Sequence, residues 1–391
     1  MQSIAENKAM DFSHGKQEPT IQEQASFLTR DYRLLASNPI HSIRVPAANR
    51  AELNTQIKAA FKSAGNMPGC NPILVGAIPF DTQKPSSLFV YRDHEKHVHS
   101  TSADYQQSQK ANRVDIEKIV RVVDEAAFQQ TVNAALKSIT CGELEKVVLS
   151  QSQSLQFKSE LDTHLLLQHL RGYNPNAYVF SVPVGLDSVF LGASPELLLS
   201  KRDRKVVSNP LAGSIPRSQD TSVDQVKSNA LRKSVKDNYE HRIVVDSIAQ
   251  KIAHHCVELA ISEYPHVLAT NTMLHLSSTV RGYLRSEAPD ALNIALDLHP
   301  TPAICGTPTA AAKDFILQNE GYDRGFYAGL VGWMDAHGNG DWAVSIRCGQ
   351  LTNRQLNVFA GAGVVVGSDP QAEWIETESK LKTLMNIFSL Q

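Results

Sequence analysis

Strand-like and helix-like segments follow one another along this chain without a strict strand–helix–strand alternation, and this order constrains the fold most. Runs rich in β-branched and aromatic residues, separated by turn residues, occur at 146–155, 177–191, 343–351 and 356–366. The apolar stretch 72–80 has the sequence of a buried strand that leads into a proline-bounded turn. Since strict alternation would indicate a parallel sheet, this order predicts an α+β protein built on large antiparallel sheets.

Three segments are predicted as helices, at about 115–137, 226–261 and 371–388. No glycine-rich phosphate loop occurs in the chain, so nucleotide chemistry is not indicated. The long second helix carries an apolar stripe that consists of Val244, Val245, Ile248, Ile252 and Cys256.

Composition and charge exclude several classes of protein. The 391 residues are 42% hydrophobic and 20% charged, and the net charge of -2 offers no basic surface for nucleic acid or an anionic membrane. No apolar run is long enough to cross a bilayer. The five cysteines are an odd, widely spaced set without a C-x-x-C pair, which is typical of reduced thiols in the cytoplasm.

Length alone allows two or three average domains. Residues 1–30 are rich in Gln, Glu, Lys and Ser and lack the basic-then-apolar pattern of a signal peptide. We therefore expect a polar N-terminal arm over 1–30, followed by the folded part of the chain.

Charged side chains lie at helical spacing near the C-terminus. Glu373, Glu376 and Lys380 are three and four residues apart, so they share one face of the last helix. A solvated helix face is the ordinary interpretation of such a pattern. The preceding strand contains Gly361 in a run of small residues, where a ligand can approach the backbone closely, although such glycines can also mark only a bulge. Together these features favour a site for an anion and a cation.

Two further charged residues are placed to face the interior or a ligand. Glu240 lies four residues before Val244 on the apolar stripe, so it should point inward and need a partner, which an ordinary salt bridge could supply. If it meets Glu376 instead, a hard cation such as Mg²⁺ has to lie between the two carboxylates. Arg347 is expected on a strand face beside small residues, where it could bind a carboxylate bidentately or lie exposed.

Six short segments between Gly142 and the C-terminus form a recognisable set: 146–150 (KVVLS), 192–196 (GASPE), 210–214 (PLAGS), 298–303 (LHPTPA), 361–363 (GAG) and 373–380 (EWIETESK). In this order they resemble the motifs of the chorismate-utilising enzymes. This family includes isochorismate synthase, salicylate synthase, anthranilate synthase component I and aminodeoxychorismate synthase component I. The stretch 75–81 is similar to siderophore-pathway isochorismate synthases in particular.

This resemblance implies one α+β domain over 31–391, most specifically matched in 142–391, with two stacked antiparallel β-sheets wrapped by helices and the active site in a cleft between them. It also implies roles for eleven residues. Lys146 would be the base that activates water, and Glu196 the general acid. Glu240 and Glu376 would be Mg²⁺ ligands, with Glu373 acting through water. Substrate carboxylates would be held by Arg347, Lys380 and the Gly361 backbone, and the pocket would be lined by Gly213, Ser214 and Ala303.

The implied reaction is the Mg²⁺-dependent conversion of chorismate to isochorismate, in which water attacks C2 and the C4 hydroxyl leaves. A glutamic acid can protonate the leaving oxygen only if its pKa is raised, which an enclosed site supplies. Without the resemblance, Lys146 would be an ordinary solvated lysine and Glu196 a charge in a loop.

Several alternatives remain open within and outside the family. A base for water disfavours the two ammonia-using enzymes, and Ala212 stands where aminodeoxychorismate synthases have a lysine, so no glutaminase partner is expected and a monomer is compatible with this function. Salicylate synthase, which eliminates pyruvate from isochorismate, and a menaquinone-pathway enzyme remain alternatives. A non-catalytic relative would lack Lys146 or Glu196, and the histidines at 94, 97 and 99 lack a complete zinc spacing.

Overall fold

Antiparallel pairing organises the strands of this chain. The computed structural model describes residues 24–65, 71–98, 115–218 and 220–388. Within these residues, hydrogen bonds join 17 strands into one antiparallel network and three more strands into a small separate sheet. The predicted α+β class with large antiparallel sheets is confirmed.

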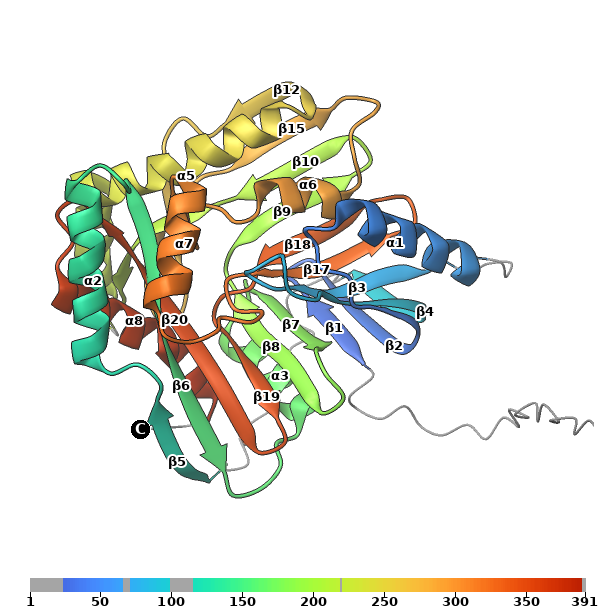
Figure 1. Ribbon diagram of the computed structural model, residues 1–391, viewed down its shortest axis with the longest axis horizontal. Helices are drawn as coiled ribbons and strands as arrows, with labels where there is room; N and C mark the ends of the chain where they lie inside the picture. Colours follow the sequence, from blue (N-terminus) through green and yellow to red (C-terminus); the bar gives the residue numbers. More distant parts are fainter. Residues whose placement is uncertain (1–23, 66–70, 99–114, 219, 389–391) are drawn as a thin grey trace, which may run out of the picture.

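The network has two regions, and the long strand β2 (Tyr32–Ile43) joins them by pairing with β1 on one side and β4 on the other (Figure 1). The first sheet region consists, in order of pairing, of β5 (Ile116–Arg121), β6 (Lys146–Phe157), β20 (Gln355–Val365), β19 (Cys348–Thr352), β8 (Ser188–Ser194), β7 (Tyr178–Pro183) and β1 (Ala25–Leu28), with the short β16 (Gly306–Thr307) also on β6. The second sheet region consists of β4 (Ser87–Val98), β3 (Ile73–Ile78), β17 (Leu330–Asp335), β18 (Gly340–Val344), β9 (Leu197–Arg202), β10 (Lys205–Asn209), β15 (Val280–Leu284) and β12 (Cys256–Ile261).

Alternate residues of the first sheet region enter two different cores. On β8, Val189 and Leu191 pack in a cluster with Leu381 of the C-terminal helix. Phe190 points to the opposite face and joins the main core, which also contains Val331 of the second sheet region. The main core therefore lies between the two regions, as predicted for two stacked sheets.

Helices cover this layered core, and many of them begin after an aspartate. Asp124, Asp162, Asp220, Asp290 and Asp369 each accept hydrogen bonds from backbone N–H groups of the first helical turn. The helices are α1 (Arg50–Ala64), α2 (Glu125–Thr140), α3 (Thr163–Tyr173), α4 (Thr221–Lys233), α5 (Val235–Ala253), α6 (Ala291–Leu298), α7 (Thr309–Asn319), α8 (Pro370–Met385) and the short 3-10 helix η3 (Asn386–Phe388).

The small sheet has a core of its own. It consists of β11 (Leu211–Pro216), β14 (Met273–Ser277) and β13 (His266–Ala269). Its buried cluster contains Leu231 of α4 together with Leu274 and Leu276 of β14. This unit lies against α5 and forms one wall of the cleft described below.

The predicted bounds of two helices were wrong. The segment 226–261 contains the end of α4, all of α5 and strand β12, because Ser234 adopts an extended conformation and caps α5. The segment 115–137 begins with strand β5, where β-branched residues pair with β6, and the helix starts only after Asp124.

The predicted N-terminal arm was too long at its C-terminal end. Residues 1–23 of the arm lie outside the described residues. Ala25–Leu28, however, form strand β1, and the side chain of Phe27 is fully buried in the main core. The aromatic residue supplies enough apolar area to hold this segment on the sheet despite its polar surroundings in sequence.

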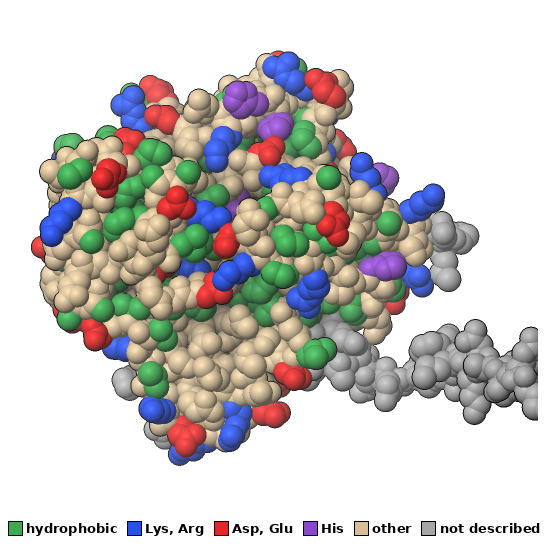
Figure 2. All heavy atoms as spheres, in the orientation of Figure 1, with side chains coloured by type: hydrophobic (Ala, Val, Ile, Leu, Met, Phe, Trp, Pro, Cys, Tyr) green, Lys and Arg blue, Asp and Glu red, His purple; other side chains and the backbone are tan. Residues whose placement is uncertain are grey.

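Charges of both signs are mixed on the molecular face drawn in Figure 2, where Lys and Arg side chains alternate with Asp and Glu. In the described part of the chain, no helix combines the length and the apolar character needed to span a membrane.

Removal of the Phe27 side chain should destabilise the protein. Phe27→Ala leaves a cavity where β1 meets the main core, so we expect the free energy of unfolding to fall by about 3–5 kcal/mol. Urea unfolding measures this loss. Leu186→Ala is the control, because Leu186 is 93% exposed; equal stability of the two variants would contradict the placement of β1.

Candidate active site

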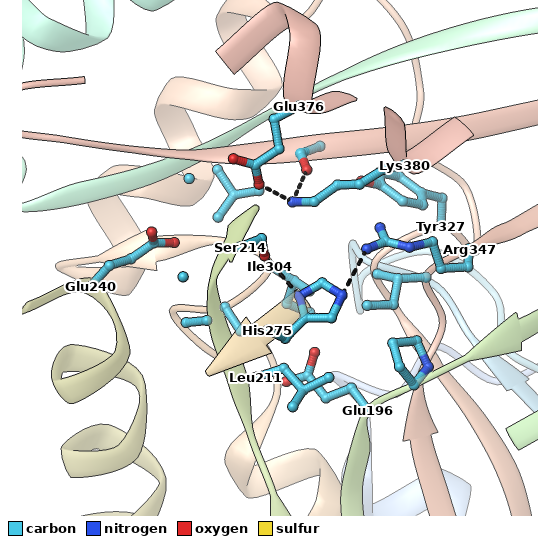
Figure 3. A pocket seen from close by; sticks show the side chains of 18 residues that line it. Glu196, Leu211, Ser214, Glu240, His275, Ile304, Tyr327, Arg347, Glu376 and Lys380 are labelled. Atoms are coloured by element: carbon cyan, nitrogen blue, oxygen red, sulfur yellow. Dashed lines mark hydrogen bonds and ion pairs between the residues drawn. The ribbon is translucent and has the colours of Figure 1, made fainter. Parts of the chain in front are cut away.

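One cleft collects most of the residues that the sequence singled out. It contains about 550 Å³ of empty space and is lined by β6, β11, β14, β20, α5, α8 and neighbouring loops (Figure 3). Nine of the eleven predicted site residues line it: Glu196, Gly213, Ser214, Glu240, Ala303, Arg347, Gly361, Glu376 and Lys380. The other two, Lys146 and Glu373, lie directly behind this lining.

Lys146 begins strand β6 and is fully buried. Its Nζ lies 2.9 Å from Oε1 of Glu240 on α5. A Cβ atom at Gly363, on the neighbouring strand β20, would collide with the Glu240 carboxylate, so only glycine lets this carboxylate approach the sheet. Burial alone would raise the pKa of Glu240, but nearby ammonium groups, with Lys146 first, lower it.

Helix α8 presents its charged residues to the cleft at the predicted helical spacing. Lys380 Nζ lies 2.5 Å from Oε1 of Glu376 and donates a hydrogen bond of 2.8 Å to the carbonyl of Gly361. One turn earlier, Glu373 is buried and lies 2.7 Å from Nζ of Lys236 on α5. Burial, and then the charge of Glu376, raise the pKa of Glu373 to about 7.

Glu196 follows strand β8 in a short loop and is also buried. Burial raises its pKa to about 7, although the positive charges of Lys146 and Arg347 favour the ionised form. Its Oε1 atom has no hydrogen-bond partner among the described residues. A carboxylic acid of this kind retains its proton close to neutral pH and can donate it to a ligand.

Arg347 does not lie on a strand, which corrects the prediction. Strand β18 ends at Val344, and Arg347 has a positive φ of 51° in the connection to β19. This conformation directs the buried guanidinium into the cleft, 3.4 Å from Nε2 of His275. The other ring nitrogen of His275 lies 2.8 Å from the Ser214 hydroxyl. Burial lowers the pKa of Arg347 to about 10, as expected for a cation without a close counter-ion.

Gly213 and Ala303 shape the walls of the cleft. Gly213 has a φ of 75° at a register shift in β11, and a Cβ there would lie 3.0 Å from the Cβ of Asp237. Ala303 lies in the turn from Thr301 to Cys305, beside the apolar side chain of Ile304. Both residues leave the space open for a ligand.

The carboxylate oxygens of Glu240 and Glu376 are of the chemical type that binds a divalent cation. Glu240 and Glu376 face the same space (Figure 3), and oxygen ligands of this type are those that Mg²⁺ prefers. Among the described residues, no three metal-ligating side chains are gathered closely enough to form a complete cluster. Lysine ammonium groups pair with these carboxylates and balance their charge.

Sequence reasoning missed four residues that the structure brings to this site. His275 and Tyr327 line the cleft, and Lys236 and Asp237 lie one turn before Glu240 on α5. The spacing of three and four residues could have identified Lys236 and Asp237. Burial, and then Glu240, raise the pKa of Asp237, which shows how much negative charge this helix face carries.

Comparisons with known proteins agree with this geometry. Residues 78–389 match the family described as chorismate binding enzyme. The chain belongs to this family. It is 38% identical to isochorismate synthase DhbC of Bacillus subtilis, over 98% of this chain and 96% of that protein. It is also 38% identical to isochorismate synthase EntC of Escherichia coli K12, over 86% of each.

A solved structure extends the comparison to the fold. The crystal structure of putative 2,3-dihydroxybenzoate-specific isochorismate synthase DhbC from Bacillus anthracis covers 95% of this chain and 98% of its own, with a TM-score of 0.87 and 34% identity. The predicted resemblance to siderophore-pathway isochorismate synthases and the predicted chorismate-utilising fold are therefore confirmed.

The buried acid Glu196 should make stability depend on pH. The folded protein holds its proton more tightly than the unfolded chain, so the wild type should lose stability relative to Glu196→Gln as pH rises from about 4.5 to about 7. Melting temperatures of both proteins across this range measure the effect. Glu143→Gln, at an exposed position, should follow the wild-type curve; a parallel curve for Glu196→Gln would contradict the raised pKa.

Proposed function

We propose that this protein is an isochorismate synthase, which converts chorismate to isochorismate. One observation carries the proposal: the acid Glu196, whose pKa is about 7, shares a cleft with two substrate-directed cations and lies near the buried Lys146. The names of the relatives above support the same reaction.

The cleft suits a ring that carries two carboxylates. Arg347 makes no ion pair with a carboxylate in the described structure, so a ligand carboxylate would supply the missing counter-charge. Lys380 and the Gly361 backbone would hold substrate carboxylates as well. Gly213, Ser214 and Ala303 would line the walls around the ring.

The reaction needs two proton transfers, and a different side chain would carry out each of them. Lys146, in its neutral amine form, would take a proton from the water molecule that attacks C2 of chorismate. Glu196 would give its proton to the C4 oxygen, which then leaves as water while the ring double bonds shift. Since one water is added and one is lost, the product has the mass of the substrate.

Glu240 and Glu376 would hold Mg²⁺, with Glu373 acting through water. When bound, the ion would supply positive charge to a substrate carboxylate, in addition to the charge of the protein cations. The chain's own part is to keep Glu240 and Glu373 buried and Glu376 half-buried, close to β6 and β20, which Gly363 and the lysine pairs make possible.

The product would supply 2,3-dihydroxybenzoate for a siderophore, in line with the name of the Bacillus anthracis relative. The protein would act in the cytoplasm, without a glutaminase partner and as a monomer. Salicylate formation and a menaquinone pathway are the alternatives that the experiments below separate from this proposal by product.

Purified protein incubated with chorismate and Mg²⁺, without an amine donor, should form an isomer of unchanged mass, and EDTA should prevent this. Chromatography with mass detection identifies the product. Salicylate with pyruvate would instead identify a salicylate synthase, and no turnover would reject both activities.

Replacement of either carboxylate should remove Mg²⁺ binding. The loss of a metal ion removes several kcal/mol of charge stabilisation, so Glu240→Gln and Glu376→Gln should each reduce turnover by about 100-fold or more. Calorimetric Mg²⁺ titration should show correspondingly weak binding. Glu378→Gln is the control on the same helix, because Glu378 pairs with Arg121 instead; wild-type Mg²⁺ affinity in the two test variants would contradict the metal assignment.

A further inference from the structure

A buried guanidinium lies behind one wall of the cleft. The side chain of Arg324, just after α7, is 2% exposed. Its Nε and Nη2 atoms donate to both carboxylate oxygens of Glu320, at 2.7 and 2.5 Å. Its Nη1 donates to the carbonyl of Ile304 at 2.8 Å, and Nη2 also donates to the carbonyl of Val148 at 2.7 Å.

The two carbonyls belong to residues on adjacent segments of the active-site lining, which the Val148 N–H also joins by donating to the carbonyl of Cys305 at 2.8 Å. Val148 lies on β6, two residues after Lys146, and Ile304 follows Ala303 in the neighbouring turn. Both line the cleft, whereas Arg324 does not. Arg324 therefore connects the wall at 303–304 to the strand that carries the proposed base.

Other contacts hold Arg324 itself in place. Oε1 of Glu320 accepts hydrogen bonds from the backbone N–H and the hydroxyl of Ser150, at 2.7 and 2.8 Å. The Ser150 hydroxyl lies 2.6 Å from the Tyr322 hydroxyl. The guanidinium also lies over the Phe80 ring, 4.5 Å from its centre. Because Ser150 is on β6 as well, Glu320 and Arg324 are both fixed to the same strand.

Stability alone is a weak explanation for this arrangement. A buried ion pair is often no more stable than apolar residues of the same volume. What an apolar residue or lysine could not supply is the planar set of donors that reaches one carboxylate and two separate carbonyls at once. Loss of these donors would take a charged partner from two buried carbonyls and leave the wall held to β6 by backbone hydrogen bonds such as that from the Val148 N–H to the carbonyl of Cys305.

We propose that Arg324 is a positioning residue for the reaction, which fixes the wall formed by Ala303 and Ile304 relative to Lys146. This inference rests on the proposed isochorismate synthase activity. Ala303 and Ile304 line the same cleft as Arg347 and Lys380, so a substrate bound by these cations would contact this wall. A displacement of about 1 Å at such a contact can reduce turnover by about 100-fold.

Arg324→Lys keeps the charge and the contact with Glu320 but cannot reach both carbonyls. We expect kcat for isochorismate formation to fall by about 10- to 100-fold. KM should change much less, because Arg347 and Lys380 are untouched. The Mg²⁺ affinity from calorimetry should equal that of the wild type, because neither α5 nor α8 contributes to the Arg324 contacts.

Arg202→Lys is the matched control. Arg202 pairs with Asp341 at 2.6 Å and donates to the carbonyls of Lys201 and Gly340, at 2.8 and 3.0 Å, and none of these residues lines the cleft. This variant should lose thermal stability while its kcat stays at the wild-type value. If Arg324→Lys also lowers only the melting temperature, Arg324 is purely structural and the inference is overturned.

Tyr322→Phe provides a second test that does not depend on the folding of Arg324→Lys. It removes only the hydroxyl that contacts Ser150, so kcat should fall by about fivefold, at unchanged Mg²⁺ affinity, since a hydrogen bond contributes roughly 1 kcal/mol. An unchanged kcat would overturn the inference if Arg324→Lys does not fold. Failure of the wild type to form isochorismate would reject the proposed function instead, so the two failures are distinguishable.

Discussion

The pairing of β6 with β20 is the constraint on which the rest of the site depends. Val365 lies opposite Lys146, and Gly363 lies opposite Val148. Because side chains alternate, Lys146 lies on the same face of the sheet as Val148 and Gly363, which line the cleft, and Val147 points to the main core. A shift of β20 by one residue would exchange its two faces, placing a valine side chain where Glu240 now approaches the sheet.

Charge balance is the second constraint, and it follows from the first. The site buries Glu240 and Glu373 and half-buries Glu376, where isolated carboxylates would be costly. Each has an ammonium group within 2.9 Å. Glu196 and Arg347 lack such ion pairs, and burial shifts the pKa of each, whereas burial and the charge of Glu376 raise the pKa of Glu373 despite its pairing with Lys236. The charged groups that are paired and those that are not thus occupy different parts of one cleft.

Much of this site could be predicted where local sequence determines geometry. The spacing of Glu373, Glu376 and Lys380 is sufficient to place them on one helical face, and the structure has them on α8 as predicted. Arg347 was different, because its orientation depends on a positive φ that alternation along a strand cannot indicate. His275 was missed for a related reason: its importance comes from contacts with Ser214 and Arg347, which are distant in sequence. The split of the predicted long helix likewise depends on strand pairing between β12 and β15, which is a tertiary contact.

Because the small sheet has a separate core, the two walls of the cleft differ in the free energy needed to open them locally. Lys146 lies on a strand embedded in the large network, whereas Ser214 and His275 lie on a sheet whose own core contains Leu231, Leu274 and Leu276. A unit that buries so little apolar surface opens at a lower free energy than the whole protein. We therefore expect its backbone amides to exchange with solvent through local opening, and those of β6 and β20 to exchange through global unfolding.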